Sequence, residues 1–186
     1  MKNYRNVTID TYNKSAQALA DYFQGIGSRV TDIERAFDLA GNPKDPSVVE
    51  IGCGDGRDAK EIVRRTNNYV GFDISDGMIK IARNYVPEAH FEVADAVSYE
   101  YPKNTDIIFA FASLLHLDKE EVEQVLSSVW QSLNTGGIFY ISSKYQPEYS
   151  EGIKKDQYGE RLFYFYNADL MKEIACSNYI SVFEDR

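Results

Sequence analysis

The residues best suited to chemistry in this chain surround a glycine-rich loop. Directly after the apolar run 48–49, alternate positions hold Glu50, Gly52, Gly54 and Gly56. An apolar, β-branched run predicts a buried parallel strand, and glycines after it predict a loop whose backbone closely approaches another group. Ligands of open α/β sheets bind at the carboxyl ends of strands, so we expect a cofactor at this loop.

The spacing of the loop separates the classes of cofactor that glycine loops bind. A phosphate-binding P-loop needs Lys followed by Ser or Thr after its last glycine, but Arg57 and Asp58 follow here. The dinucleotide fingerprint G-x-G-x-x-G also fails, and the carboxylates of Glu50 and Asp55 would repel a pyrophosphate. Two carboxylates suit a cationic ligand without phosphate, such as S-adenosylmethionine with its ammonium and sulfonium groups. A tight turn that binds nothing is the alternative.

With these residues the sequence resembles the class I S-adenosylmethionine-dependent methyltransferases, whose first motif reads acidic-x-Gly-x-Gly-x-Gly. The resemblance covers about residues 46–143. It implies S-adenosyl-L-methionine as cofactor and S-adenosyl-L-homocysteine as product. It also implies that Glu50 and the glycine loop, including Cys53, hold the methionine part of the cofactor.

Two further carboxylates follow predicted strands. Asp73 ends the predicted strand 69–74 and can accept hydrogen bonds from both ribose hydroxyls. By resemblance, the adenine ring is flanked by Ile74 and Met78, while its edge meets Asp95 and Ala96 after the predicted strand 90–96. Ile74 and Met78 would look the same as ordinary core residues, and Asp95 could instead cap a turn.

The predicted central strand 106–112 runs into a loop that contains His116. By the same resemblance, Ala112 and Ser113 belong to the cofactor site. We assign His116 to catalysis, because a histidine can take a proton from an acceptor hydroxyl or amine. His116 could equally be a packed histidine satisfied by a backbone carbonyl, since methyl transfer often needs only alignment of the acceptor. No metal site is expected.

The whole chain of 186 residues is predicted to form one α/β domain. We expect a three-layer, doubly wound, mostly parallel sheet that lacks the last antiparallel strand of the resembled family. Its parts are a helical segment (1–43), a cofactor-binding core (46–143) and a C-terminal part (144–186) with a lid-like loop. An unpaired sheet edge favours association, so the chain could be a monomer or a homodimer.

Apolar spacing predicts the other elements. A helix that begins after Tyr12 is expected within 10–26, and further helices are expected over 30–40 and 58–65. We expect Tyr12 to pack at the start of the first helix rather than to face the cofactor. A helix from Asp118 should end at Gly136-Gly137, followed by a strand at 138–143. Residues 144–161 show no periodicity and read as a lid or a mobile loop. The remaining expected elements are a strand at 162–166, a helix capped by Asn167 and a strand at 179–183.

Composition narrows the acceptor and the compartment. The net charge of −9 argues against a nucleic acid partner, which leaves a small molecule as the favoured acceptor. The two cysteines, the polar first residues and the lack of a long apolar run favour a cytoplasmic protein without a membrane segment.

The sequence thus predicts methyl transfer from S-adenosylmethionine to an O, N or S atom of a small molecule. One alternative is a regulatory module that binds this cofactor without turnover. The other is a nicotinamide-dependent oxidoreductase, which the glycine spacing and the acidic loop oppose.

Overall fold

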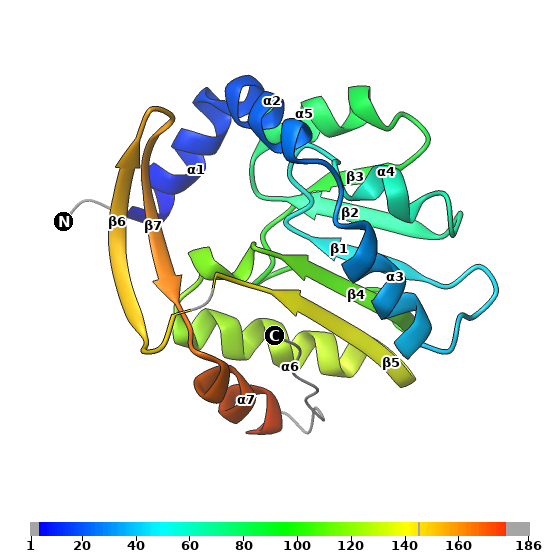
Figure 1. The fold of residues 1–186 in the computed structure, drawn as a ribbon. Coiled ribbons are helices and arrows are strands. Elements are labelled where there is room, and N and C mark those ends of the chain that lie inside the picture. The colour runs from blue at the N-terminus through cyan, green and yellow to red at the C-terminus, as the bar shows by residue number, and fades with distance from the viewer. Residues whose placement is uncertain (1–3, 145, 178–186) are drawn as a thin grey trace.

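A computed structural model describes residues 4–144 and 146–177 of the chain. At its centre lies a five-stranded sheet with strand order β3-β2-β1-β4-β5, in which every neighbouring pair is parallel (Figure 1). The strands are β1 (Val48–Ile51), β2 (Tyr69–Asp73), β3 (His90–Val93), β4 (Thr105–Phe111) and β5 (Leu133–Ser142). The winding reverses between β1 and β4, which confirms the predicted doubly wound, mostly parallel sheet.

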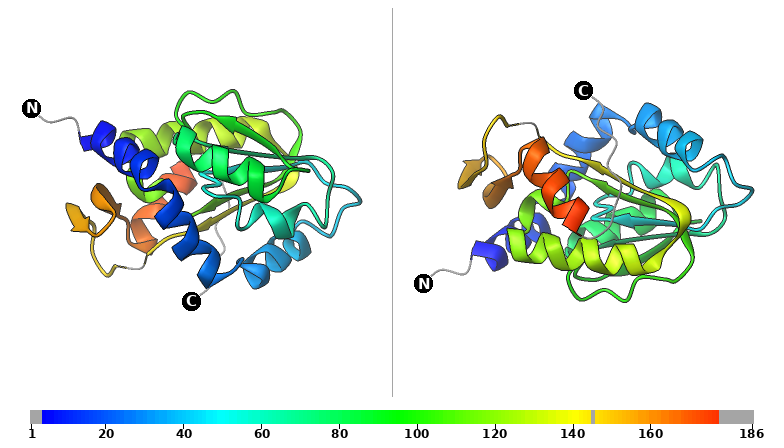
Figure 2. Two further views of the ribbon diagram at one scale, coloured as in Figure 1. Left: turned by 90° about the horizontal axis from the view of Figure 1, so that it is seen from above. Right: turned by 90° about the horizontal axis from the view of Figure 1, so that it is seen from below.

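Helices cover both faces of this sheet, with α3 and α6 on opposite sides (Figure 2). One layer contains α3 (Val30–Leu39), α4 (Ala59–Ile62) and α5 (Asp76–Tyr85), and the other contains α6 (Lys119–Ser132) and α7 (Ala168–Ser177). Side chains of β1 alternate between them: Val48 packs in the first core, while Val49 and Ile51 pack in the second. The three-layer prediction is therefore confirmed.

The N-terminal region differs from the prediction. Instead of one helix over 10–26, the structure has α1 (Tyr4–Lys14) and α2 (Ala16–Ile26), so Tyr12 lies within α1 rather than before it. The buried residues of α1 are Thr8 and Thr11. Since both are polar, the helix leaves no apolar stripe in the sequence from which to predict it.

Residues 144–161 also differ from the prediction of an irregular loop. They contain β6 (Ser150–Asp156) and the start of β7 (Gly159–Phe165), which pair as an antiparallel hairpin beside α1 (Figure 1). The hairpin forms a sheet of its own, so no antiparallel strand joins the central sheet within the described residues. The strand expected at 162–166 falls largely within β7.

Smaller corrections concern element ends. The glycines at 136–137 lie inside β5 rather than ending a helix, because α6 already stops at Ser132. The helix after the glycine loop has only four residues. The strand expected at 179–183 lies outside the described residues. Among the described helices, none is both long and apolar enough to cross a membrane.

Candidate functional site

A cavity of about 190 Å³ opens at the carboxyl ends of β1, β2 and β4. This is the switch point of the sheet, where open α/β folds bind ligands. All the predicted site residues except Gly56 line the cavity: Glu50, Gly52, Cys53, Gly54, Asp73, Ile74, Met78, Asp95, Ala96, Ala112, Ser113 and His116. The chain therefore brings together residues that are up to 66 positions apart, from Glu50 to His116.

The glycines of the loop differ in what they do. Gly52 has φ +68°, and a Cβ built on it would lie 2.4 Å from Cβ of Ser113, so only glycine fits between β1 and β4. Gly56 has φ +80°, and a Cβ built on it would lie 3.2 Å from the Ala82 methyl group of α5. Gly56 thus seats the loop on α5 and does not reach the cavity, in contrast to the prediction.

Asp73 is held in a fixed orientation at the end of β2. Its Oδ2 accepts a hydrogen bond from the Gly54 amide (3.1 Å) and its Oδ1 accepts one from the Ser75 amide (2.8 Å). Burial raises the pKa of Asp73 to about 6, although both amide bonds favour the charged form. Asp73 is therefore an oriented hydrogen-bond acceptor at the rim of the glycine loop.

Glu50 is buried at the end of β1, with the Tyr69 hydroxyl donating to its Oε2 at 2.6 Å. Gly71 provides the space for this hydroxyl, since a Cβ at that position would lie 2.2 Å from it. Burial, assisted by the charge of Asp58, raises the pKa of Glu50 to about 8. A cationic ligand beside Glu50 would reverse this effect by favouring the carboxylate.

The same end of the cavity holds two arginines that the sequence reading missed. Arg29 donates from its amide and its guanidinium to the buried Asp58, and Arg57 also pairs with Asp58 (3.3 Å). Arg57 donates in addition to the Phe23 carbonyl (3.2 Å). Arg29 and Arg57 share the carboxylate of Asp58 and both line the cavity, so their guanidinium groups can also pair with a ligand carboxylate.

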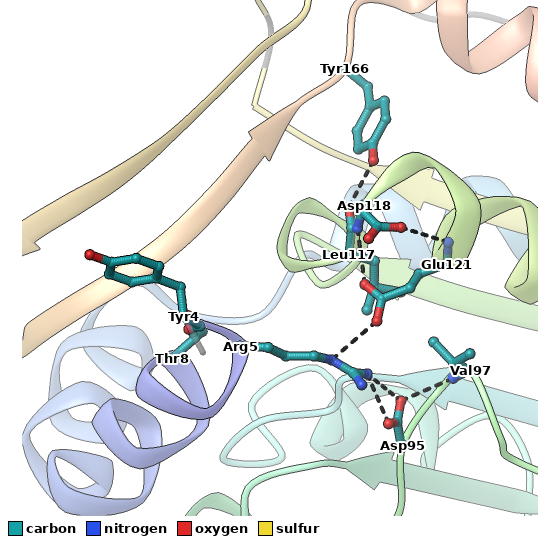
Figure 3. A network of polar contacts seen from close by, with 9 residues as sticks. All are labelled: Tyr4, Arg5, Thr8, Asp95, Val97, Leu117, Asp118, Glu121 and Tyr166. Carbon is teal, nitrogen blue, oxygen red and sulfur yellow. Dashed lines mark hydrogen bonds and ion pairs between the residues drawn. The ribbon is translucent and has the colours of Figure 1, made fainter. Parts of the chain in front are cut away.

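Asp95 binds a residue that is 90 positions away in the chain (Figure 3). Nη2 of Arg5 donates to both carboxylate oxygens of Asp95 (2.7 and 2.8 Å), and its Nε lies 3.3 Å from Glu121. The Val97 amide donates to the same carboxylate (3.1 Å). This network fastens α1 across the cavity and places Arg5 in its lining. Its partners come from separate elements, so no sequence spacing indicated Arg5.

His116 hydrogen bonds at both ring nitrogens. Nδ1 lies 2.7 Å from the Leu162 carbonyl, so it carries the proton, and Nε2 accepts from the Tyr12 hydroxyl at 2.9 Å. Burial lowers the pKa of His116 to about 4, which keeps the ring neutral at physiological pH. The predicted backbone carbonyl partner is therefore present, yet both His116 and Tyr12 line the cavity.

The comparison with known families identifies the core of this structure. A family model described as a methyltransferase domain matches residues 48–137, which include the glycine loop, Asp73, Asp95 and His116. Residues 48–137 therefore belong to the methyltransferase-domain family. This confirms the resemblance seen in the sequence.

Relatives of this chain differ in length from it. It is 31% identical over 102 residues to a trans-aconitate 2-methyltransferase of Variovorax paradoxus, a match covering 53% of this chain and 39% of that protein. It is 26% identical over 162 residues to an uncharacterized methyltransferase of Alkaliphilus oremlandii, covering 83% and 71%. The chain thus spans about two fifths of the first relative.

Solved structures share the fold of this chain. One is the S-adenosylmethionine-bound amino pentose methyltransferase CalS10 of Micromonospora echinaspora, with a TM-score of 0.69, 13% identity and 87% of each chain covered. At this identity the similarity describes the fold.

The cavity fits S-adenosylmethionine as its cofactor. Two buried side-chain atoms that line it, Oδ2 of Asp55 and Oγ of Ser113, have no hydrogen-bond partner within the described residues. Such atoms are costly unless a ligand satisfies them. Together with Glu50 and Asp73 they provide acceptors for the hydroxyl and ammonium groups of S-adenosylmethionine.

Proposed function

We propose that this chain transfers a methyl group from S-adenosylmethionine to an O, N or S atom of a small molecule. The observation that carries the proposal is the pair of oriented carboxyl groups, Glu50 and Asp73, on either side of the glycine loop in a cavity at the switch point of the sheet. Bound in this cavity, the cofactor would supply an electrophilic methyl group on a sulfonium.

Each predicted residue then has a role toward the cofactor. Glu50 and the glycine loop with Cys53 bind the methionine part, and Asp73 accepts from the ribose hydroxyls. The adenine is bound by residues that line the far part of the cavity: Ile74, Met78, Asp95 and Ala96. Ala112 and Ser113 lie at the end of β4, next to the glycine loop, and form the wall near the methyl group.

His116 and Tyr12 are the proposed acceptor-facing pair. The neutral imidazole accepts from the Tyr12 hydroxyl, so a proton leaving the acceptor can enter at the Tyr12 oxygen while the Tyr12 proton moves to Nε2. The Leu162 carbonyl stabilises the imidazolium that results. Alignment of the acceptor supplies the rest of the acceleration.

A small acceptor is supported by the relative named for trans-aconitate. The net charge of −9 opposes a nucleic acid acceptor. As part of the same proposal, we place the chain in the cytoplasm, because two cysteines in 186 residues fit a reducing compartment. We also propose that it is a monomer or a homodimer.

Calorimetric titration with S-adenosylhomocysteine tests the proposal. Asp73→Ala should weaken binding about tenfold to a hundredfold, because it removes a charged contact worth about 1.5–3 kcal/mol. Asp106→Ala is the matched control, since Asp106 also accepts from a backbone amide, that of Ser47, but lies at the opposite end of the sheet. Absence of binding to the parent chain would overturn the cofactor assignment.

Turnover separates the proposal from its alternatives. Release of S-adenosylhomocysteine from S-adenosylmethionine in the presence of a small-molecule acceptor panel is expected. Binding without any such release would indicate the regulatory module, and tight NADH binding without S-adenosylhomocysteine binding would indicate the oxidoreductase.

A further inference from the structure

Lys154 and Arg161 of the hairpin lie near Lys144, which follows β5, around one ring beside the cavity. We propose that the methyl acceptor has an anionic group, a carboxylate or a phosphate, and that Lys144, Lys154 and Arg161 bind it beside Phe163. We call these four residues the basic cluster. The inference rests on the proposed function and specifies the class of acceptor.

Three cations surround one aromatic ring in the basic cluster. The distances to the ring centroid of Phe163 are 5.2 Å from Lys144 Nζ, 5.7 Å from Lys154 Nζ and 5.5 Å from Arg161 Cζ. Lys154 lies directly opposite Arg161 in the β6–β7 register, so both side chains project from one face. Like charges this close repel one another unless an anion lies between them.

The space opposite Phe163 in the basic cluster is open to such an anion. Gly152 lies opposite Phe163 in the register, and a Cβ built on Gly152 would meet nothing within 4 Å. The position across from the ring is therefore open, with Lys154 two residues along the same strand. An anion here can bridge the ammonium groups of the two lysines.

Carboxylates balance the positive charge of the basic cluster only in part. Asp156 pairs with Arg161, but neither Lys144 nor Lys154 forms an ion pair with a carboxylate of the described residues. Lys155, on the other face of the same strand, pairs with Glu160 at 3.5 Å. Buried Arg161 also keeps its Nε without a partner among the described residues. In a chain of net charge −9, two lysines without a carboxylate partner among the described residues favour an anionic ligand.

The basic cluster adjoins the predicted site of methyl transfer. The ring of Phe163 lies 4.7 Å from the ring of His116, and the Arg161 guanidinium lies 5.6 Å from the ring of Tyr12, measured between centres. Both His116 and Tyr12 line the cavity. Desolvation, Lys154 and Arg161 together lower the pKa of Lys144, as expected of a cation among cations. An acceptor anchored here by its anionic end would extend its nucleophile toward Tyr12.

Titration of the S-adenosylhomocysteine-saturated chain with citrate and with inorganic pyrophosphate tests the proposal. These probes distinguish a carboxylate site from a phosphate site. We expect at least one of them to bind, and Lys144→Gln with Lys154→Gln to weaken that binding tenfold or more. Gly152→Asp should weaken it similarly, because it places a carboxylate in the open position opposite Phe163.

Two matched controls isolate the effect. Lys155→Gln removes a cation from the opposite face of the same strand, and Gly152→Asn fills the same space without a charge, so each should change anion binding less than threefold. The inference is overturned if neither probe binds the saturated chain, or if the variants and controls bind alike. Failure of S-adenosylhomocysteine to bind would instead contradict the proposed function, and the probes would then be titrated into the free chain.

Discussion

Glu50 is a buried carboxyl group whose charge should depend on the ligand. Its pKa of about 8 leaves it mostly protonated at pH 7, because burial disfavours the carboxylate. The ammonium group of the proposed cofactor would favour the carboxylate, so binding should release close to one proton at pH 7. Affinity should then rise as the pH increases from 6 toward 8. Calorimetry of S-adenosylhomocysteine binding in buffers of different ionisation enthalpy measures the released proton.

Glu50→Gln is the variant that tests this assignment. The amide keeps the shape and an acceptor for the Tyr69 hydroxyl but cannot ionise. It should bind the ligand more weakly and release less than half as much proton as the parent. Equal proton release by parent and variant would show that another group ionises, and Asp73, with a pKa of about 6, would be the next to test.

Gly52 and Gly54 provide a second comparison of single residues. Both have positive φ, +68° and +56°, so alanine is strained by about 1–2 kcal/mol at either position. At Gly52 the new Cβ would also lie 2.4 Å from Ser113, whereas at Gly54 its nearest neighbour is the flexible end of Met78 at 3.5 Å. Gly52→Ala should therefore lower the melting temperature more than Gly54→Ala does. A larger loss for Gly54→Ala in thermal denaturation would contradict this account of the loop.

At the scale of elements, α1 and β7 form one wall of the site through polar contacts. The Leu162 amide donates to Thr8 (2.9 Å), while Thr11 and Ser15 donate to the carbonyls of Glu160 (2.7 Å) and Tyr158 (2.6 Å). Side chains one helical turn apart thus meet alternate residues of an edge strand, which would otherwise be open to another chain.

Thr8→Val should loosen this wall without changing its shape. Valine cannot accept from the Leu162 amide, and an unsatisfied buried amide costs about 1–3 kcal/mol. We expect that amide to exchange with deuterium about tenfold faster or more, as measured by NMR or mass spectrometry. Thr31→Val, at an exposed position of α3, is the control and should leave the rate unchanged. Equal rates in both variants would mean that Thr8 does not protect the strand.

The elements that the sequence predicted well are those whose burial is apolar. The strands β1 and β4 and the helix α6 bury Val, Ile and Leu, so periodicity alone located them. Because α1 buries Thr8 and Thr11, and β6 is mostly exposed and polar, their patterns carried no such signal. The hairpin is specified by its contacts with residues of α1, and these residues lie some 150 positions away in the chain.

The site was predictable to the same degree. Residues at strand ends, such as Asp73 and His116, follow from the motif and the topology, and they line the cavity. Arg5, Arg29 and Arg57 were missed because their partners lie in other elements. Their arrangement is visible only after the chain has folded.

At the scale of the whole molecule, the cavity joins distant parts of the chain, since its lining runs from Arg5 to Leu117 and α1 ties it to β7. We therefore expect residues 1–186 to unfold as one domain, with far-UV circular dichroism and the fluorescence of Trp130 in α6 giving the same transition. S-adenosylhomocysteine at a hundred times its dissociation constant should stabilise the folded chain by about 2.7 kcal/mol and raise the midpoint by about 5–11 °C.

S-adenosylhomocysteine should move the entire unfolding transition to higher temperature. The rise of the midpoint should be smaller in Asp73→Ala at the same ligand concentration, because that variant binds less of the ligand. A second transition that the ligand does not move would show that part of the chain, such as the hairpin, unfolds separately from the cofactor site. The probes would then disagree, because Trp130 reports on α6, which packs on the central sheet. Coincident transitions that move together would instead mean that the α1–β7 contacts couple the acceptor wall to the cofactor core, so that binding at one stabilises the other.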